Sequence, residues 1–155
     1  EHRSFDISAP YIPHQESIDS FRRGLPTSRR ASSLTLWMSL RAHGWNAVRD
    51  SVRENIRLTR LLERELVKAG FRVLADGELS MACVRFEPLG LSAEAVDSLQ
   101  ADIARDLVAS GETWFATFLH DGELWMRFNL VNIHTQERHI YRLVDLLRQT
   151  ACGLG

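Results

Sequence analysis

Arg127 is the residue whose surroundings point most clearly to chemistry. It lies in residues 124–131, which together with residues 113–119 flank Asp121-Gly122, a dipeptide typical of two-residue hairpin turns. The register that this turn sets places Arg127 opposite Ala116, on an aromatic side of the hairpin. The other residues on that side are Trp114, Phe118, Trp125 and Asn129.

A guanidinium on such a face needs a partner, because it is removed from water. Its forked donors fit a carboxylate or a phosphate. The sequence leaves two interpretations of Arg127 open: binding of an anionic ligand, or stacking on Trp125 or Trp114 at a surface or subunit contact. The opposite side of the hairpin is apolar, and we expect it to pack against helices. Its residues are Phe115, Thr117, Leu119, Leu124, Met126 and Phe128.

The other reactive residue types form no recognisable site. The six histidines contain no H-x-x-x-H or H-E-x-x-H pair, so we expect no metal. Cys83 and Cys152 are far apart and outside any C-x-x-C motif, which favours a reducing, cytoplasmic setting. The only lysine, Lys68, precedes Gly70 at the end of a predicted helix, where a cation is usual. Tyr11, in a proline-rich stretch, is interpreted as a hydrophobic contact of that stretch.

The composition describes one globular domain. The chain has 155 residues, 45% of them hydrophobic and 25% charged, with a formal net charge of −1. These values exclude a membrane-spanning, disordered or polybasic protein, and we expect no nucleic-acid or membrane partner. Residues 1–30 predict an extended arm, and residues 31–155 predict the domain itself.

Hydrophobic periodicity within the domain predicts the element order α, α, β, β, α, β, β, α. The first helix ends near His43, where Gly44 interrupts it; Ser92 caps the third helix and Thr135 the last. Strands at residues 71–75 and 81–87 precede the hairpin. This order predicts an α+β fold, with helices packed on a largely antiparallel sheet.

The stretch from Ser28 to Gly44, SRRASSLTLWMSLRAHG, resembles the segment that opens the C-terminal small domain of pyridoxal-phosphate-dependent (group II) amino-acid decarboxylases. This group contains the aromatic-L-amino-acid, histidine and glutamate decarboxylases. The resemblance continues through residues 83–86 and 124–132, and residues 4–13 resemble the family's mobile catalytic loop. It implies the small C-terminal domain of a type I pyridoxal-phosphate enzyme, working as a homodimer with active sites at the subunit interface.

The resemblance implies roles for three residues. Tyr11 matches the loop tyrosine that protonates the carbanion after carbon dioxide leaves; related aldehyde-forming enzymes carry phenylalanine there, so tyrosine favours simple decarboxylation. Arg127 matches a small-domain arginine that binds a substrate carboxylate, with a side-chain acid or the domain interface as alternative partners. Ser28 matches a pocket position that is glycine with indole substrates and serine with phenolic or imidazole ones. We therefore expect an aromatic L-amino acid, tyrosine or dopa before tryptophan, although residues 31–33 depart from the aromatic-decarboxylase pattern.

The family's cofactor lysine would lie shortly before Glu1, and Lys68 is in the wrong segment to replace it. We therefore expect a C-terminal chain or fragment of a longer enzyme, inactive without an N-terminal large-domain part that binds most of the pyridoxal phosphate. Two alternatives remain open. One is oxidative or aldehyde-forming chemistry on the same scaffold; the other is a non-catalytic module whose Arg127 face binds a small carboxylate or a partner protein.

Overall fold

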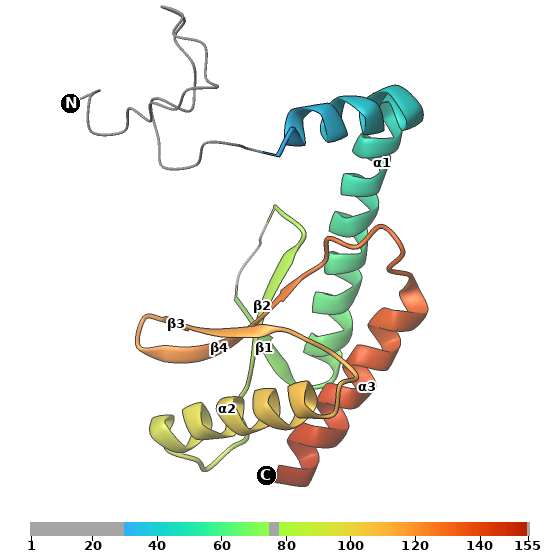
Figure 1. Cartoon of the computed structure of the whole chain (residues 1–155). Coiled ribbons are helices and arrows are strands. Elements are labelled where there is room, and N and C mark those ends of the chain that lie inside the picture. Colours follow the sequence, from blue (N-terminus) through green and yellow to red (C-terminus); the bar gives the residue numbers. More distant parts are fainter. Residues whose placement is uncertain (1–29, 75–77, 155) are drawn as a thin grey trace, which may run out of the picture. The chain divides into compact units, whose positions relative to one another are not determined.

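Figure 1 shows the computed structural model of the chain, which describes residues 30–74 and 78–154. The chain divides into two compact units, Glu1–Gly44 and Trp45–Gly155. The predicted arm of residues 1–30 lies, apart from residue 30, outside the described residues, and its boundary stays a prediction. In the described part, the elements are α1 (Ser32–Lys68), β1 (Phe71–Val73), β2 (Met81–Phe86), α2 (Ala93–Ala109), β3 (Ala116–His120), β4 (Glu123–Asn129) and α3 (Glu137–Leu154).

The predicted interruption at Gly44 is confirmed. Its backbone, with φ 77° and ψ 166°, is not helical, so α1 consists of two helical segments that meet at this residue. A positive φ of this size is open to glycine but strained for residues with a Cβ. Gly44 is also the last residue of the first unit.

The four strands form one antiparallel sheet, as predicted, and their order is β1-β2-β4-β3. The hairpin register is also confirmed: Ala116 pairs with Arg127, and Phe118 with Trp125. Asp121 and Gly122 at the turn have φ angles of 50° and 81°. Two consecutive positive φ angles match the right-handed twist of the strands that they connect.

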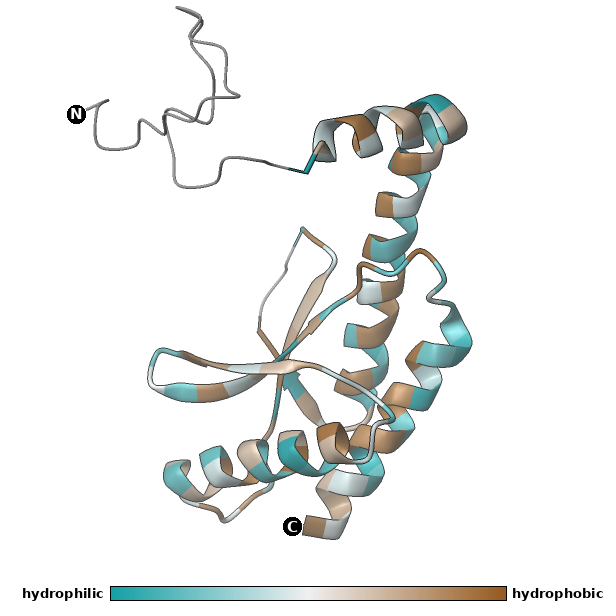
Figure 2. Ribbon diagram, viewed as in Figure 1, coloured by the Kyte–Doolittle hydropathy of each residue, from teal (hydrophilic) through white to brown (hydrophobic). Residues whose placement is uncertain are grey.

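One face of the sheet carries the hydrophobic core. Side chains alternate along a strand, so Val84 of β2 and Met126 and Phe128 of β4 point to this face, where the helices cover them. Leu58, Leu62 and Leu66 of α1 pack in the same cluster, as do Ile103 of α2 and Leu147 of α3. Figure 2 shows hydrophilic and hydrophobic residues alternating along α1 and α3, as expected for helices with one buried side.

Side-chain contacts fix the helices and their ends. Arg57 Nη1 of α1 donates to Glu137 Oε1 at 2.6 Å, which connects α1 to the first turn of α3. Ser92 caps α2 as predicted, since its side chain accepts a hydrogen bond from Ala95 N–H at 3.3 Å. The predicted cap Thr135 is one residue too early, because α3 begins at Glu137 and follows Gln136. None of the helices that the structure describes combines the length and the apolar character needed to cross a bilayer.

The apolar side of the hairpin is covered only in part. Phe115, Met126 and Phe128 are buried as expected, with the Phe115 and Phe128 ring centroids 4.5 Å apart. Leu119, next to the turn, is 70% exposed. The prediction that the whole side packs against helices is therefore wrong at its turn end.

Candidate anion-binding site

The face of the sheet opposite the core, called here the outer face, carries the charged residues. Arg72 of β1 pairs with Arg85 of β2, and Cys83 of β2 pairs with Arg127 of β4. Trp125 lies two residues before Arg127 on β4 and therefore points to the same side. Three arginines and a tryptophan thus share this face. The arginines differ in whether carboxylates form ion pairs with them.

Arg85 is fully paired, and its side chain is only 2% exposed. Its Nε donates to Glu87 Oε1 at 2.9 Å, and its Nη1 lies 2.6 Å from Asp97 Oδ1 of α2 and also donates to the Leu124 carbonyl. Asp97 Oδ1 accepts a second hydrogen bond, from Leu124 N–H at 2.9 Å. This N–H and then the Arg85 guanidinium hold the pKa of Asp97 below its usual range. The network fixes α2 against the first residues of β4.

Arg72 is paired as well and covers Trp125. Its guanidinium carbon lies 4.5 Å from the centroid of the Trp125 ring, a cation–π contact. Arg72 Nη1 lies 2.9 Å from Glu87 Oε1, and Nη2 contacts Glu123 Oε2. Trp125 is only 1% exposed under this cover, so its indole ring has a fixed place on the outer face.

Arg127 differs from both, because no hydrogen bond or ion pair reaches its guanidinium from residues 30–74 or 78–154. Its Nε is buried without an acceptor. Its guanidinium carbon lies 5.9 Å from the Phe118 ring centroid, so the stacking interpretation is partly correct, with Phe118 in place of Trp125 or Trp114. Stacking on a ring leaves every N–H of the guanidinium free to donate.

Cys83, across from Arg127, does not neutralise this charge. Burial raises the pKa of the Cys83 thiol, the positive charge of Arg127 opposes that rise, and Glu63 adds to it. The thiol is therefore protonated at neutral pH and offers only weak acceptor character. Cys83 therefore leaves the Arg127 guanidinium without a strong acceptor, and a carboxylate is the group whose geometry its donors fit.

Trp125 has the same unmet need, since its indole Nε1 is buried with no acceptor in the described part of the chain. Buried N–H groups without acceptors are rare in folded proteins. Trp125 and Arg127 thus place two such groups on adjacent outer-face positions of one strand. Sequence reasoning did not identify Trp125 as a donor or Arg85 and Asp97 as a pair, because each property depends on contacts between distant segments.

Of the other candidate residues, the structure describes only Lys68. Tyr11 and Ser28 lie outside the described residues. Lys68 lies in the last turn of α1, as predicted; it is 68% exposed and its Nζ lies 2.7 Å from Glu65 Oε1. Within the described ranges, no group of histidine, cysteine and acidic side chains could hold a metal ion.

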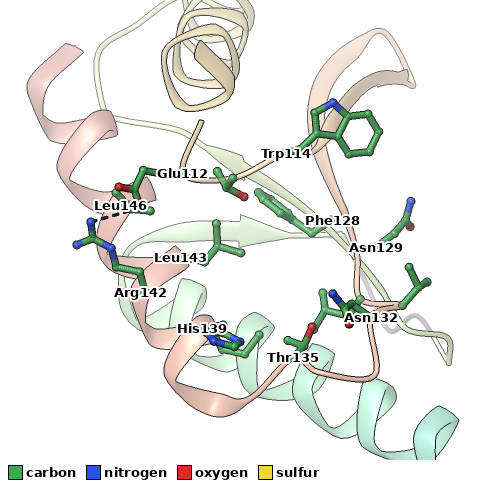
Figure 3. A pocket seen from close by; sticks show the side chains of 14 residues that line it. Glu112, Trp114, Phe128, Asn129, Asn132, Thr135, His139, Arg142, Leu143 and Leu146 are labelled. Carbon is green, nitrogen blue, oxygen red and sulfur yellow. Dashed lines mark ion pairs between the residues drawn. The ribbon is translucent and has the colours of Figure 1, made fainter. Parts of the chain in front are cut away.

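A cavity of about 440 Å³ lies at the end of β4, next to α3 (Figure 3). Phe128, Leu143 and Leu146 supply apolar walls, and an ion pair of 3.6 Å joins Glu112 to Arg142 beside them. His139 Nδ1 accepts a hydrogen bond from Gln136 N–H at 3.2 Å, which caps the start of α3. These polar groups of the cavity thus already have partners within the domain. The buried donors without acceptors, Trp125 Nε1 and Arg127 Nε, lie on the outer face instead.

The fold is an α+β domain, and Arg127 on its outer face is the candidate residue for binding an anion. No protein-family model matches the sequence. Tryptophan decarboxylase 2 of Oryza sativa subsp. japonica is 30% identical over 128 residues, which is 82% of this chain and 26% of that protein. The 3,4-dihydroxyphenylacetaldehyde synthase of Drosophila melanogaster is 27% identical over 143 residues, 88% of this chain and 27% of that protein.

A solved structure shares the fold. Oryza sativa TDC with PLP and tryptamine superposes with a TM-score of 0.80 at 18% identity, over 98% of this chain and 33% of that one. In sequence and in fold, the chain thus resembles part of the pyridoxal-phosphate-dependent group II amino-acid decarboxylases. It spans about a quarter of the length of the curated relatives that it matches.

Proposed function

We propose that this chain is the C-terminal part of a pyridoxal-phosphate-dependent L-amino-acid decarboxylase, a lyase that releases carbon dioxide and an amine. Arg127 binds a carboxylate of the substrate. The observation that carries the proposal is the buried, unpaired Arg127 Nε on an aromatic face, in a domain that resembles these decarboxylases. The neighbouring arginines, Arg72 and Arg85, already have carboxylate partners.

The described residues are suited to binding the substrate, and they offer no suitable lysine for covalent attachment of the cofactor. Lys68, the only lysine, is paired with Glu65 at the surface. The cofactor lysine and most other cofactor contacts therefore belong to an N-terminal large-domain part. Bound pyridoxal phosphate would supply the electron sink that decarboxylation requires.

The residues of this chain bind and orient the substrate and protonate its Cα. Arg127 holds a carboxylate against the sheet, and the aromatic side chains around it exclude water. Tyr11, in the role that the family resemblance implies, delivers the phenolic proton to Cα after carbon dioxide has left. Ser28 contributes a hydroxyl to the side-chain pocket and favours a polar aromatic ring, so tyrosine and dopa precede tryptophan as substrates. The whole enzyme is a cytoplasmic homodimer with active sites at the subunit interface.

The first experiment asks whether a cofactor-binding partner exists. The protein purified from its source cells is examined by a denaturing gel, mass spectrometry and visible absorbance. A longer chain or a second chain with a cofactor lysine, together with absorbance from bound pyridoxal phosphate, supports the enzyme. A colourless single species of 17.7 kDa that binds no pyridoxal phosphate instead supports the non-catalytic, carboxylate- or protein-binding module.

Aldehyde-forming chemistry is the second candidate, favoured by the match to an aldehyde synthase. The Tyr11→Phe variant of the assembled enzyme separates the two. If Tyr11 protonates Cα, the variant still binds substrate and cofactor, loses amine formation by at least about 100-fold and gains aldehyde. Amine formation at the wild-type rate would remove Tyr11 from the mechanism. Aldehyde as the main wild-type product would establish the second candidate.

A further inference from the structure

Two buried donors without acceptors lie on adjacent outer-face positions of β4. They are the indole N–H of Trp125 and the Nε–H of Arg127. We propose that Trp125 is the second donor of the anion site, so that its indole N–H and the Arg127 guanidinium bind one carboxylate together. This inference rests on the proposed carboxylate-binding role of Arg127 and adds a residue to it.

Trp125 and Arg127 are both neighbours of Phe118 on β3. Phe118 pairs with Trp125 in the hairpin register, and the Arg127 guanidinium lies over the Phe118 ring at 5.9 Å. Arg72 stacks on the Trp125 ring at 4.5 Å and is itself held by Glu87 and Glu123. The indole is therefore packed under Arg72, and it lies two residues from Arg127 on the same side of β4.

The charges on this face indicate which anion fits. Arg72 and Arg85 carry two positive charges, and three carboxylates pair with them, those of Glu87, Asp97 and Glu123. Arg127 is the third cation of this face and has no ion-pair partner in the described ranges, so the three arginines and three carboxylates sum to zero charge. A bound carboxylate adds one negative charge to this neutral set, whereas a phosphate dianion would add two, so the monoanion costs less to hold there.

The chemistry of the two donors suits a carboxylate for a second reason. An ionised carboxylate has two oxygens and only accepts hydrogen bonds, whereas an indole N–H and a guanidinium only donate them. An amine product no longer has the α-carboxylate. If the bound group is the α-carboxylate, both donors lose their acceptor when carbon dioxide leaves, and the site then favours release of the product over rebinding.

The test uses the four tryptophan indole N–H signals in a ¹H–¹⁵N spectrum of the ¹⁵N-labelled chain. The exposed tryptophans Trp37, Trp45 and Trp114 are each replaced by phenylalanine, which assigns the Trp125 signal by elimination without disturbing a buried residue. Sodium acetate is then titrated against sodium chloride at constant ionic strength. We expect the Trp125 signal to move downfield and saturate with acetate, and the Arg127→Gln variant to abolish the shift.

Affinity gives the second measurement. Trp125→Phe keeps an aromatic ring under Arg72 and removes the N–H donor, and it should weaken acetate binding about tenfold. Trp114→Phe, on the same hairpin but 78% exposed, should leave it unchanged. Acetate binding that needs Arg127 but leaves the Trp125 signal in place would overturn the role of Trp125 and keep that of Arg127. Absence of any acetate-dependent change would overturn the two-donor site.

Discussion

Replacing Arg85 and Arg127 separately by methionine distinguishes a structural arginine from a ligand-binding one. Both lie on the outer face, but Arg85 is paired with Glu87 and Asp97, and Arg127 has no partner in the described part of the chain. Arg85→Met removes the donor shared by Glu87, Asp97 and the Leu124 carbonyl, although Glu87 keeps Arg72 and Asp97 keeps the Leu124 N–H. Arg127→Met removes a buried N–H that has no acceptor. Both substitutions replace arginine by methionine, so any difference in their effect on stability comes from the surroundings of each residue.

The structure sets the expected magnitudes. Removing one partner of a buried ion pair costs about 3–5 kcal/mol. Because the side chains of Glu87 and Asp97 stay 33% and 31% exposed, we expect the low end, about 3 kcal/mol. With an m-value of about 2 kcal/mol/M, the urea midpoint falls by about 1.5 M. Arg127→Met should unfold at the wild-type midpoint or slightly above it, because an unpaired buried donor destabilises the folded state.

Equilibrium urea unfolding, followed by far-UV circular dichroism and tryptophan fluorescence, measures both variants. Arg105→Met is the matched control, since Arg105 is 67% exposed and pairs with Asp102 at 2.7 Å on the surface of α2. Such pairs contribute little to stability, and the control should match the wild type. If Arg127→Met lowers the midpoint as far as Arg85→Met does, Arg127 is a structural residue, and the argument for an external carboxylate is refuted.

Three further predictions follow from single contacts. Folding lowers the pKa of Asp97, so the ionised carboxylate stabilises the fold above an unfolded-state pKa of about 3.9. This contribution is lost as the pH falls through the pKa of the folded state. Asp97→Asn should therefore reduce the loss of unfolding free energy at acid pH. Gly122→Ala should lower the free energy of unfolding by about 1 kcal/mol, measured by urea unfolding, because the residue has φ 81°. Cys83 is buried and Cys152 exposed, so a thiol reagent should modify Cys152 first; Arg127→Met should slow the reaction of Cys83 further, since the opposing charge on its pKa is lost.

The sequence predicted the parts of the fold that local chemistry determines. Asp121-Gly122 selects the turn, the turn selects the register, and the register places Ala116 opposite Arg127. Gly44 interrupts the first helix and Ser92 caps α2, because a positive φ and a capping hydroxyl are properties of single residues. These features need no knowledge of distant segments.

The remaining features depend on contacts between segments. The sequence does not show that Asp97, on a helix, reaches Arg85 on a strand, or that Arg72 covers Trp125. Nor does it show that the helices stop short of the hairpin turn and leave Leu119 exposed. The Phe118 ring replaced the predicted stacking partners of Arg127 for the same reason, since the direction of a long side chain depends on its neighbours.

The pairing pattern of the outer face explains how one arginine can be kept available for a ligand. A site built from three unpaired arginines would repel itself and would bind any anion. Here Arg72 and Arg85 are neutralised within the domain, and they hold the indole and β4 in place. Arg127 then acts as a single charge on a rigid support. A tight ion pair to the departing carboxylate would stabilise the substrate as well as the transition state. Binding that divides the carboxylate between one cation and one neutral indole N–H lowers that ground-state cost while keeping the geometry fixed.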